Sequence, residues 1–347
     1  MPVHPLPDLR AVILSRAGSL KTVVISLVSL ILFAASAYSV YAPAGGAGGP
    51  AFSDPAEIME MPDEWQAGPI THAQKDADLV VTLDGQMYHA WEPLIQAYAK
   101  EHGLKIVVNN GTCGVSAGGL AHKSIDMGVF CCPPDRTDRL PGIRFHTLGI
   151  AALALLVHPD NPNGDVTLEQ ARQLFGGTIR KWSRPGEAGK TYSLVLPVGR
   201  LHCKLRPGHW RLVLDNKELF SPDLIEVGAM PDMIAKVSAN PGAIGFETIW
   251  MMRYYEDMGK TKFLKINGHS PEDPANILSL KYPLYRVYSY ATWEGKNLEN
   301  PYAVKLGEYL MQAAEHLDAK YAFIPASELR KAGWKFSGGE LTGEPEQ

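Results

Sequence analysis

The residues LVVTLDG, at positions 79–85, form a short run of apolar and β-branched side chains that ends in an Asp-Gly pair. A run of this kind, closed by a turn signal, predicts a buried β-strand. Further strands are predicted over 105–108 and 126–130, with helices over 87–102 and from about Ser116 to Ser124 between them. Alternating strands and helices favour a parallel sheet with right-handed crossovers. The sequence therefore predicts an α/β fold.

A second set of elements follows in the chain. Residues 150–157 (IAALALLV) are all apolar and predict a buried strand that crosses into a second lobe. A helix is predicted over 167–175, because Thr167 and Gln170 occupy the two positions of a capping box. Residues 285–290 alternate in polarity and are expected to return to the first lobe. The sequence thus predicts two lobes that are linked by more than one crossing of the chain.

Length and charge limit the class of protein. The chain has 347 residues, and at about 150 residues per domain this suggests two domains. Its formal net charge of −4 lacks the basic excess that is typical of a nucleic-acid-binding protein.

The N-terminus has the pattern of an export signal. Arg10, Arg16 and Lys21 precede an apolar run over 22–42, and a basic flank before an apolar stretch is typical of such signals. The run is also close to the length that spans a bilayer, so cleavage and retention as a membrane anchor both stay open. Either outcome places the folded part outside the cytoplasm. Residues 43–77 are interpreted as a linker and surface segment.

Six short segments, in the same order along the chain, resemble the phosphate-binding proteins of ABC uptake systems, within the type 2 periplasmic binding-protein superfamily. The resemblance covers about residues 78–325. The segments are Asp84-Gly85, Gly111–Gly114 (GTCG), Asp126–Val129 (DMGV), Leu168–Trp182 (LEQARQLFGGTIRKW), Pro241–Phe246 (PGAIGF) and Lys281–Tyr290 (KYPLYRVYSY).

The resemblance implies an α/β fold of two lobes, each a mixed sheet flanked by helices, joined by two hinge strands. Lobe 1 would comprise residues 78–150 and 286–347, and lobe 2 residues 151–285. It also implies a non-catalytic receptor that acts as a monomer, binds a small inorganic ligand between its lobes and presents it to an ABC permease. The family holds its ligand with backbone N–H groups at helix N-termini, where anions are favoured, and with hydroxyl groups.

The ligand loops of this chain depart from the family pattern, in which Ser and Thr are common. All four cysteines fall on these loops. The candidate ligand-binding residues are Asp84, Gly85, Thr112, Cys113, Gly114, Cys131, Cys132, Arg200, His202, Cys203 and Lys204.

Three interpretations of the cysteines stay open. Cys113 can form a structural disulfide with Cys131 or Cys132, since an exported protein meets an oxidising compartment. Alternatively, Cys113, Cys132 and Cys203 bind a soft metal ion or a metalloid, because thiolates prefer soft ions. Third, an oxyanion is bound mainly by backbone N–H groups, with help from Arg200, Lys204 and Thr112. No cofactor is predicted with certainty.

A different class of function remains possible for the same fold. The cysteines would then serve a membrane-anchored metal or redox sensor without transport. An enzyme is disfavoured, because Cys203 and His202 are adjacent in sequence and adjacent loop side chains usually point apart.

Overall fold

The computed structural model describes residues 52–183, 191–200, 213–214, 217–294 and 298–346. The predicted signal or anchor over 1–42 and the first part of the linker lie outside these residues. Among the residues described, no helix combines the length and apolar character needed to cross a bilayer.

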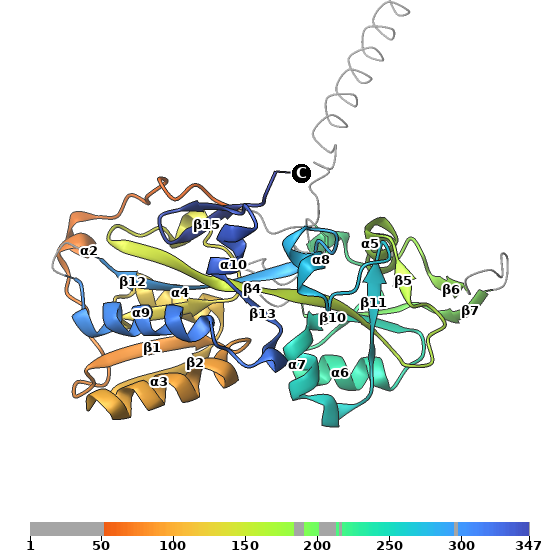
Figure 1. Ribbon diagram of the computed structural model, residues 1–347, viewed down its shortest axis with the longest axis horizontal. Coiled ribbons are helices and arrows are strands. Elements are labelled where there is room, and N and C mark those ends of the chain that lie inside the picture. The colour runs from red at the N-terminus through yellow and green to blue at the C-terminus, as the bar shows by residue number, and fades with distance from the viewer. Residues whose placement is uncertain (1–51, 184–190, 201–212, 215–216, 295–297, 347) are drawn as a thin grey trace, which may run out of the picture. The chain divides into compact units, whose positions relative to one another are not determined.

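The first lobe begins with the alternating strands and helices that the sequence predicts (Figure 1). The strands pair in parallel, β1 between β2 and β3. These elements are β1 (Leu79–Asp84), α3 (Tyr88–His102), β2 (Ile106–Gly111), α4 (Cys113–Ala121) and β3 (Met127–Phe130).

The second lobe contains several short strands and helices. Its helix α5 starts with the predicted capping box, in which Thr167 Oγ1 accepts the Gln170 N–H at 3.0 Å and Gln170 Oε1 accepts the Thr167 N–H. The elements are β5 (Asp165–Val166), α5 (Leu168–Gly176), β6 (Lys181–Ser183), β7 (Thr191–Leu194), β8 (Leu196–Gly199), β9 (Ile225–Glu226), α6 (Met230–Ser238), β10 (Ala243–Thr248), α7 (Ile249–Tyr254), β11 (Lys262–Ile266) and α8 (Pro274–Leu278).

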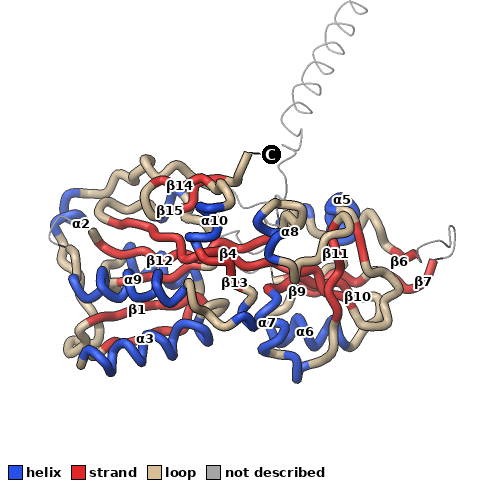
Figure 2. Tube along the Cα trace, in the orientation of Figure 1, coloured by secondary structure: helices blue, strands red, loops and turns tan. Residues whose placement is uncertain are grey.

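Two long antiparallel strands connect the lobes, β4 (Ile143–Val157) and β12 (Tyr285–Trp293). The part of β4 over 143–152 pairs with β12, and its part over 153–157 pairs with β10. The strand order is β2-β1-β3-β12-β4-β10-β8-β9, and Figure 2 shows β4 continuing from one group of strands into the other. These two strands are the hinge strands that the resemblance implies.

The chain ends on the first lobe and beside β4. Strand β13 pairs with β4, and β14 pairs with β15. The elements are α9 (Pro301–Ala314), β13 (Phe323–Pro325), α10 (Ala326–Lys331), β14 (Lys335–Ser337) and β15 (Glu340–Gly343). Before β1, the segment with the short helix α2 (Asp63–Ala67) packs on the first lobe, where the Trp65 indole N–H donates to the Ala121 carbonyl at 2.7 Å.

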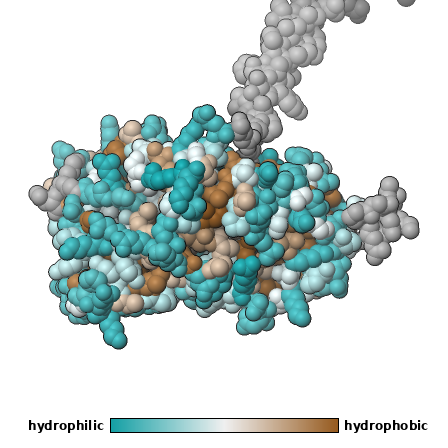
Figure 3. All heavy atoms as spheres, in the orientation of Figure 1, coloured by the Kyte–Doolittle hydropathy of each residue, from teal (hydrophilic) through white to brown (hydrophobic). Residues whose placement is uncertain are grey.

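Each lobe has its own buried apolar cluster. Trp91, Phe130 and Trp293 lie in the cluster of the first lobe, and Phe175 and Phe246 in that of the second. The face drawn in Figure 3 is largely hydrophilic, with smaller hydrophobic patches towards its middle. The apolar residues that predicted the strands therefore supply the packing that holds each sheet to its helices.

Two predicted boundaries were wrong. Helix α4 begins at Cys113, three residues before the predicted Ser116, so the expected Gly-rich loop is the end of β2 and the first turn of α4. Thr112 makes this start possible, because its side chain accepts the Val115 N–H as an N-cap. Strand β4 begins at Ile143 rather than at Ile150, because β12 pairs with it along the whole extra length.

Candidate ligand site

Asp84 stands at the carboxyl end of β1 and organises the residues around it. Its side chain is buried, and both of its oxygens accept backbone hydrogen bonds: Oδ1 from the Gln86 N–H at 2.9 Å and Oδ2 from the Cys113 N–H at 2.8 Å. Burial raises the pKa of Asp84, although the bond from Gln86 opposes the shift. The carboxyl group thus fixes the first residue of α4 against the end of β1.

Cys113 occupies that first helical position. Its thiol lies 3.3 Å from Asp84 Oδ2, and its sulfur accepts the Cys131 N–H at 3.1 Å. Cys131 and Cys132 directly follow β3, whose carboxyl end lies beside that of β1 in the parallel sheet. The sheet topology therefore brings residues that are separated in sequence to one edge.

Three sulfur atoms meet at this edge. Cys113 Sγ is 3.4 Å from Cys131 Sγ and 3.5 Å from Cys132 Sγ. Ligand atoms of all three residues lie within 4.8 Å of one another, and all three side chains are buried. We call Cys113, Cys131 and Cys132 the thiol cluster.

The thiols are held in a poorly solvated place. Burial raises the pKa of Cys113 well above its ordinary value, and hydrogen bonds with the other two thiols add to this shift. For Cys131, the hydrogen bond with Cys113 lowers the pKa, but the bond with Cys132 and burial outweigh it, and the pKa is raised.

The disulfide interpretation of Cys113 with Cys131 or Cys132 does not hold in the structure, where no disulfide joins these residues. Their sulfur atoms are more than 3 Å apart, whereas a disulfide requires about 2.0 Å.

The hinge strand β12 contributes Arg286 and Tyr288 to the same region. Ser289 pairs with Phe130, so Tyr288 lies next to the start of the segment that carries Cys131. Burial raises the pKa of Tyr288, and the charge of Arg286 opposes this shift. Among the residues described, the Tyr288 hydroxyl is buried and has no hydrogen-bond partner.

The second lobe adds Glu247, Thr248 and Arg200. Glu247 is at the end of β10 and is 1% exposed. Its Oε1 accepts a bond from Gln86 Nε2 at 2.9 Å, and its Oε2 is 3.7 Å from Arg200 Nη1. Arg200 follows β8 and is 8% exposed, and its Nε and Nη1 make no hydrogen bond among the residues described. Buried polar groups without hydrogen-bond partners are rare in proteins, which makes Arg200 and Tyr288 candidates for contact with a ligand.

The other predicted site residues have different roles or lie outside the described residues, and His89, which was not among them, makes a contact with the second lobe. Gly85 donates its N–H to the Gly111 carbonyl, and a side chain at position 85 would approach Met230 of the second lobe. Thr112 caps α4, and Gly114 is in its first turn. His89 stacks on Tyr254 with ring centroids 4.3 Å apart. The predicted residues outside the described part are His202, Cys203 and Lys204.

Sequence reasoning missed Gln86, Glu247, Arg286 and Tyr288. Arg286 and Tyr288 lie inside the return-strand segment that carried the resemblance, and Glu247 directly follows the PGAIGF segment. A polar residue in an apolar strand was the available signal, since such a residue needs a buried partner.

Two cavities lie beside His146 and Glu294, away from these residues. Their volumes are ≈ 410 Å³ and ≈ 390 Å³, and no member of the thiol cluster lines either of them. His146 and Glu294 contact each other at 2.6 Å. We therefore place the candidate site by its buried polar groups rather than by cavity size.

Comparisons with known proteins agree with the fold. No protein-family model matches the chain. The chain is similar to the phosphate-binding protein PstS of Bacillus subtilis, with 24% identity over 260 residues that cover 72% of this chain and 82% of that protein.

Two solved structures share the fold. One is an ABC-type phosphate transport receptor from Vibrio cholerae, with a TM-score of 0.59 and 18% identity; the match covers 71% of this chain and 99% of that chain. The other is a phosphate ABC transporter substrate-binding protein from Clostridium perfringens with bound phosphate, with a TM-score of 0.60, 17% identity and the same coverage.

These matches confirm the predicted resemblance and the two-lobe fold of type 2 periplasmic binding proteins. The matched proteins are a phosphate-binding protein, a phosphate transport receptor and a substrate-binding protein.

Proposed function

We propose that this protein is an extracytoplasmic receptor that binds a small inorganic solute between its lobes and delivers it to an ABC permease. The similarity to phosphate receptors over most of the chain supports this function. The basic flank and apolar run at the N-terminus support export. Cleavage of that run, or its retention as an anchor, and a monomeric state are parts of the same proposal.

One observation carries the proposal. The carboxyl ends of β1, β3 and β10, the N-terminus of α4 and the hinge strand β12 gather acids, thiols and arginines in one buried region. Ligands of open α/β sheets bind at the carboxyl ends of the strands. Arg200 and Tyr288 keep buried donor groups without a hydrogen-bond partner among the described residues, as expected for groups that bind a ligand.

The donor set bears on the class of ligand. Arg200 and the N–H groups near the start of α4 suit an oxyanion. Asp84 and Glu247, in contrast, are buried carboxyl groups that repel an anion unless the anion or the carboxyl carries a proton. The thiol cluster is suited to a soft ion or a metalloid. We therefore propose that both kinds of solute be tested on the same protein.

A binding screen with a conformational readout tests the receptor function. The reduced, exported form of the protein is titrated calorimetrically with phosphate, arsenate, arsenite, Zn(II) and Cu(I), and small-angle scattering follows lobe closure. We expect one solute to bind at a single site and to compact the protein. If none of these solutes binds or changes the scattering, the receptor proposal fails.

The short distances between sulfur atoms favour one alternative, a membrane-anchored metal or redox sensor. A sensor cysteine is oxidised reversibly, which requires the buried cluster to become accessible to its oxidant. Counting free thiols before and after mild oxidation, on protein from the native compartment, separates the two functions. Reversible disulfide formation without any solute binding would favour the sensor.

A further inference from the structure

The thiol cluster has the geometry of a three-coordinate site. Sulfur atoms that bind one ion at about 2.3 Å lie no more than about 4.6 Å apart. Cys113 Sγ is 3.4 Å from one sulfur and 3.5 Å from the other, and all three sulfurs lie within 4.8 Å of one another, close to this limit. Little rearrangement is therefore needed for all three to bind one central atom.

Polar groups near the thiol cluster also indicate a bound ligand. The Tyr288 hydroxyl and two nitrogens of Arg200 are buried without a hydrogen-bond partner among the residues described. Tyr288 is close enough to Cys131 and Asp84 for electrostatic interaction with both. Arg200 Nη1 is 3.7 Å from Glu247 Oε2. These groups belong to the same region as the sulfurs and are independent of them.

Charge balance distinguishes between the ions or central atoms that three sulfurs can bind. Among the described residues, the carboxyl groups of Asp84 and Glu247 are matched by the guanidinium groups of Arg200 and Arg286. Three thiolates around a monovalent ion leave two negative charges, and around a divalent ion they leave one. Around a trivalent centre they leave none. Uncompensated charge in a buried place is strongly unfavourable, so a trivalent centre fits best.

We propose that Cys113, Cys131 and Cys132 bind a trivalent metalloid, which arrives as its neutral trihydroxide. Arsenious acid is the representative member of this class. The proposal rests on the receptor function above and names the class of solute for the same site.

The binding step balances without an oxidant or reductant. Each of the three As–O bonds of arsenious acid is replaced by an As–S bond. Each thiol proton leaves with a displaced hydroxide as water, so three thiols and one As(OH)₃ give one As(SR)₃ group and three waters. Arsenic remains trivalent, and the net charge of the site does not change.

Native mass spectrometry of the full exported protein, reduced and titrated with arsenite, tests this step directly. We expect one arsenic atom per chain together with the loss of three hydrogens. An adduct that keeps one hydroxyl, with a gain of one arsenic and one oxygen and a net loss of one hydrogen, would mean that only two thiols bind, and would overturn the three-coordinate assignment.

Serine variants test the ligands. Cys113→Ser, Cys131→Ser and Cys132→Ser should each weaken arsenite binding by about a hundredfold. Mutation of a residue that merely orients a metal ligand already lowers metal affinity 10–100-fold, and these residues are the proposed ligands themselves. Val115→Ser is the matched control, since it places a hydroxyl on an exposed position of α4, and it should bind normally. Thermal unfolding without arsenite checks that each variant is folded.

Competing solutes separate this inference from the receptor function. Tighter binding of Zn(II) or Cu(I) than of arsenite overturns the inference. Binding of phosphate with no binding of arsenite overturns it as well but leaves the receptor function intact. If none of these solutes binds, both proposals fail.

Discussion

At the scale of single residues, Asp84 determines where Cys113 lies. Its two oxygens accept the backbone N–H groups of Gln86 and Cys113, and all three residues are buried. Asp84→Ala leaves both donors without an acceptor, at a cost of roughly 1–3 kcal/mol for each. We expect a clear loss of unfolding free energy in urea at pH 7 under reducing conditions.

The matched control for this prediction is Asp160→Ala. The Asp160 side chain is 84% exposed, and its ion pair with His158 is long, at 3.8 Å. Its loss should change stability by no more than about 0.5 kcal/mol. Equal stability of the two variants would show that Asp84 does not hold the start of α4.

The sequence pointed to some of these residues and missed others for a physical reason. Asp84, Cys113 and Cys131 were predicted because the resemblance implies ligand loops at these positions, and the parallel sheet brings all three to one edge. Gln86 and Glu247 were missed because their partnership joins residues 161 positions apart. Nothing in the local sequence specifies a pairing over that distance.

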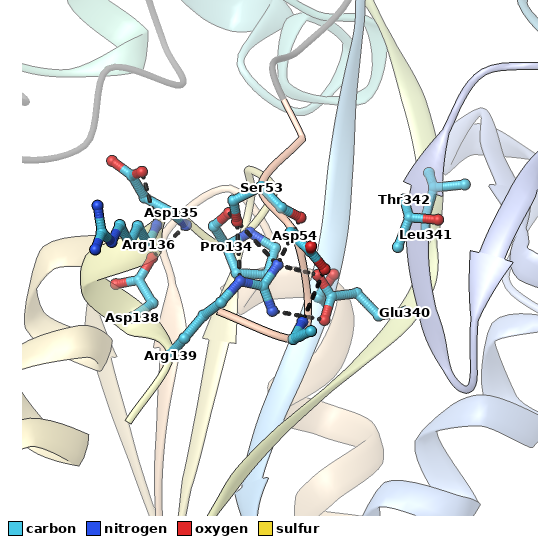
Figure 4. Close-up of polar contacts among 12 residues, drawn as sticks. Ser53, Asp54, Pro134, Asp135, Arg136, Asp138, Arg139, Glu340, Leu341 and Thr342 are labelled. Carbon is cyan, nitrogen blue, oxygen red and sulfur yellow. Dashed lines mark hydrogen bonds and ion pairs between the residues drawn. The ribbon is translucent and has the colours of Figure 1, made fainter. Parts of the chain in front are cut away.

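At the scale of elements, a buried ion pair ties the C-terminal hairpin to the first lobe. Arg139 donates to Glu340 of β15 at 2.7 Å and 3.1 Å, and also to Ser53 near the start of the described chain (Figure 4). Glu340→Gln leaves the buried guanidinium without its counter-charge. Removing one partner of a buried ion pair costs about 3–5 kcal/mol. We expect a decrease of this size in the free energy of unfolding, measured by chemical denaturation.

An exposed pair of the same kind provides the control. Glu328 contacts Lys331 at 2.7 Å, but both side chains are largely exposed. Glu328→Gln should therefore cost no more than about 1 kcal/mol. Similar losses in the two Gln variants would mean that the Arg139–Glu340 pair contributes no more than a surface contact.

Element boundaries were predictable where caps or strong periodicity define them. The capping box of Thr167 and Gln170 marked the start of α5 correctly. The start of α4 was misplaced because its glycines suggested a loop, whereas Thr112 caps the helix before them. The extra length of β4 depends on pairing with β12, which comes more than 120 residues later in the sequence.

At the scale of the whole molecule, side chains from the two lobes contact each other beside the candidate site. Gln86 of the first lobe donates to Glu247 and accepts from Thr248 of the second, at 2.9 Å and 3.0 Å. His89 of α3 stacks on Tyr254 of α7, whose hydroxyl lies 3.2 Å from His89 Nδ1. The resemblance implied two lobes that close on a ligand, and these contacts are of the kind that a closed receptor makes.

The Gln86 contacts should slow ligand release, because a bond to a buried charged group contributes about 1.5–3 kcal/mol. In Gln86→Ala, we expect the solute identified by the binding screen to dissociate about tenfold to a hundredfold faster, with little change in its association rate.

Stopped-flow measurement gives both rates, and small-angle scattering should show a more open bound state. Gln96→Ala, an exposed Gln on the same helix α3, should behave like the unmodified protein. If the two variants release the solute equally fast, closure does not depend on the contacts between Gln86, Glu247 and Thr248.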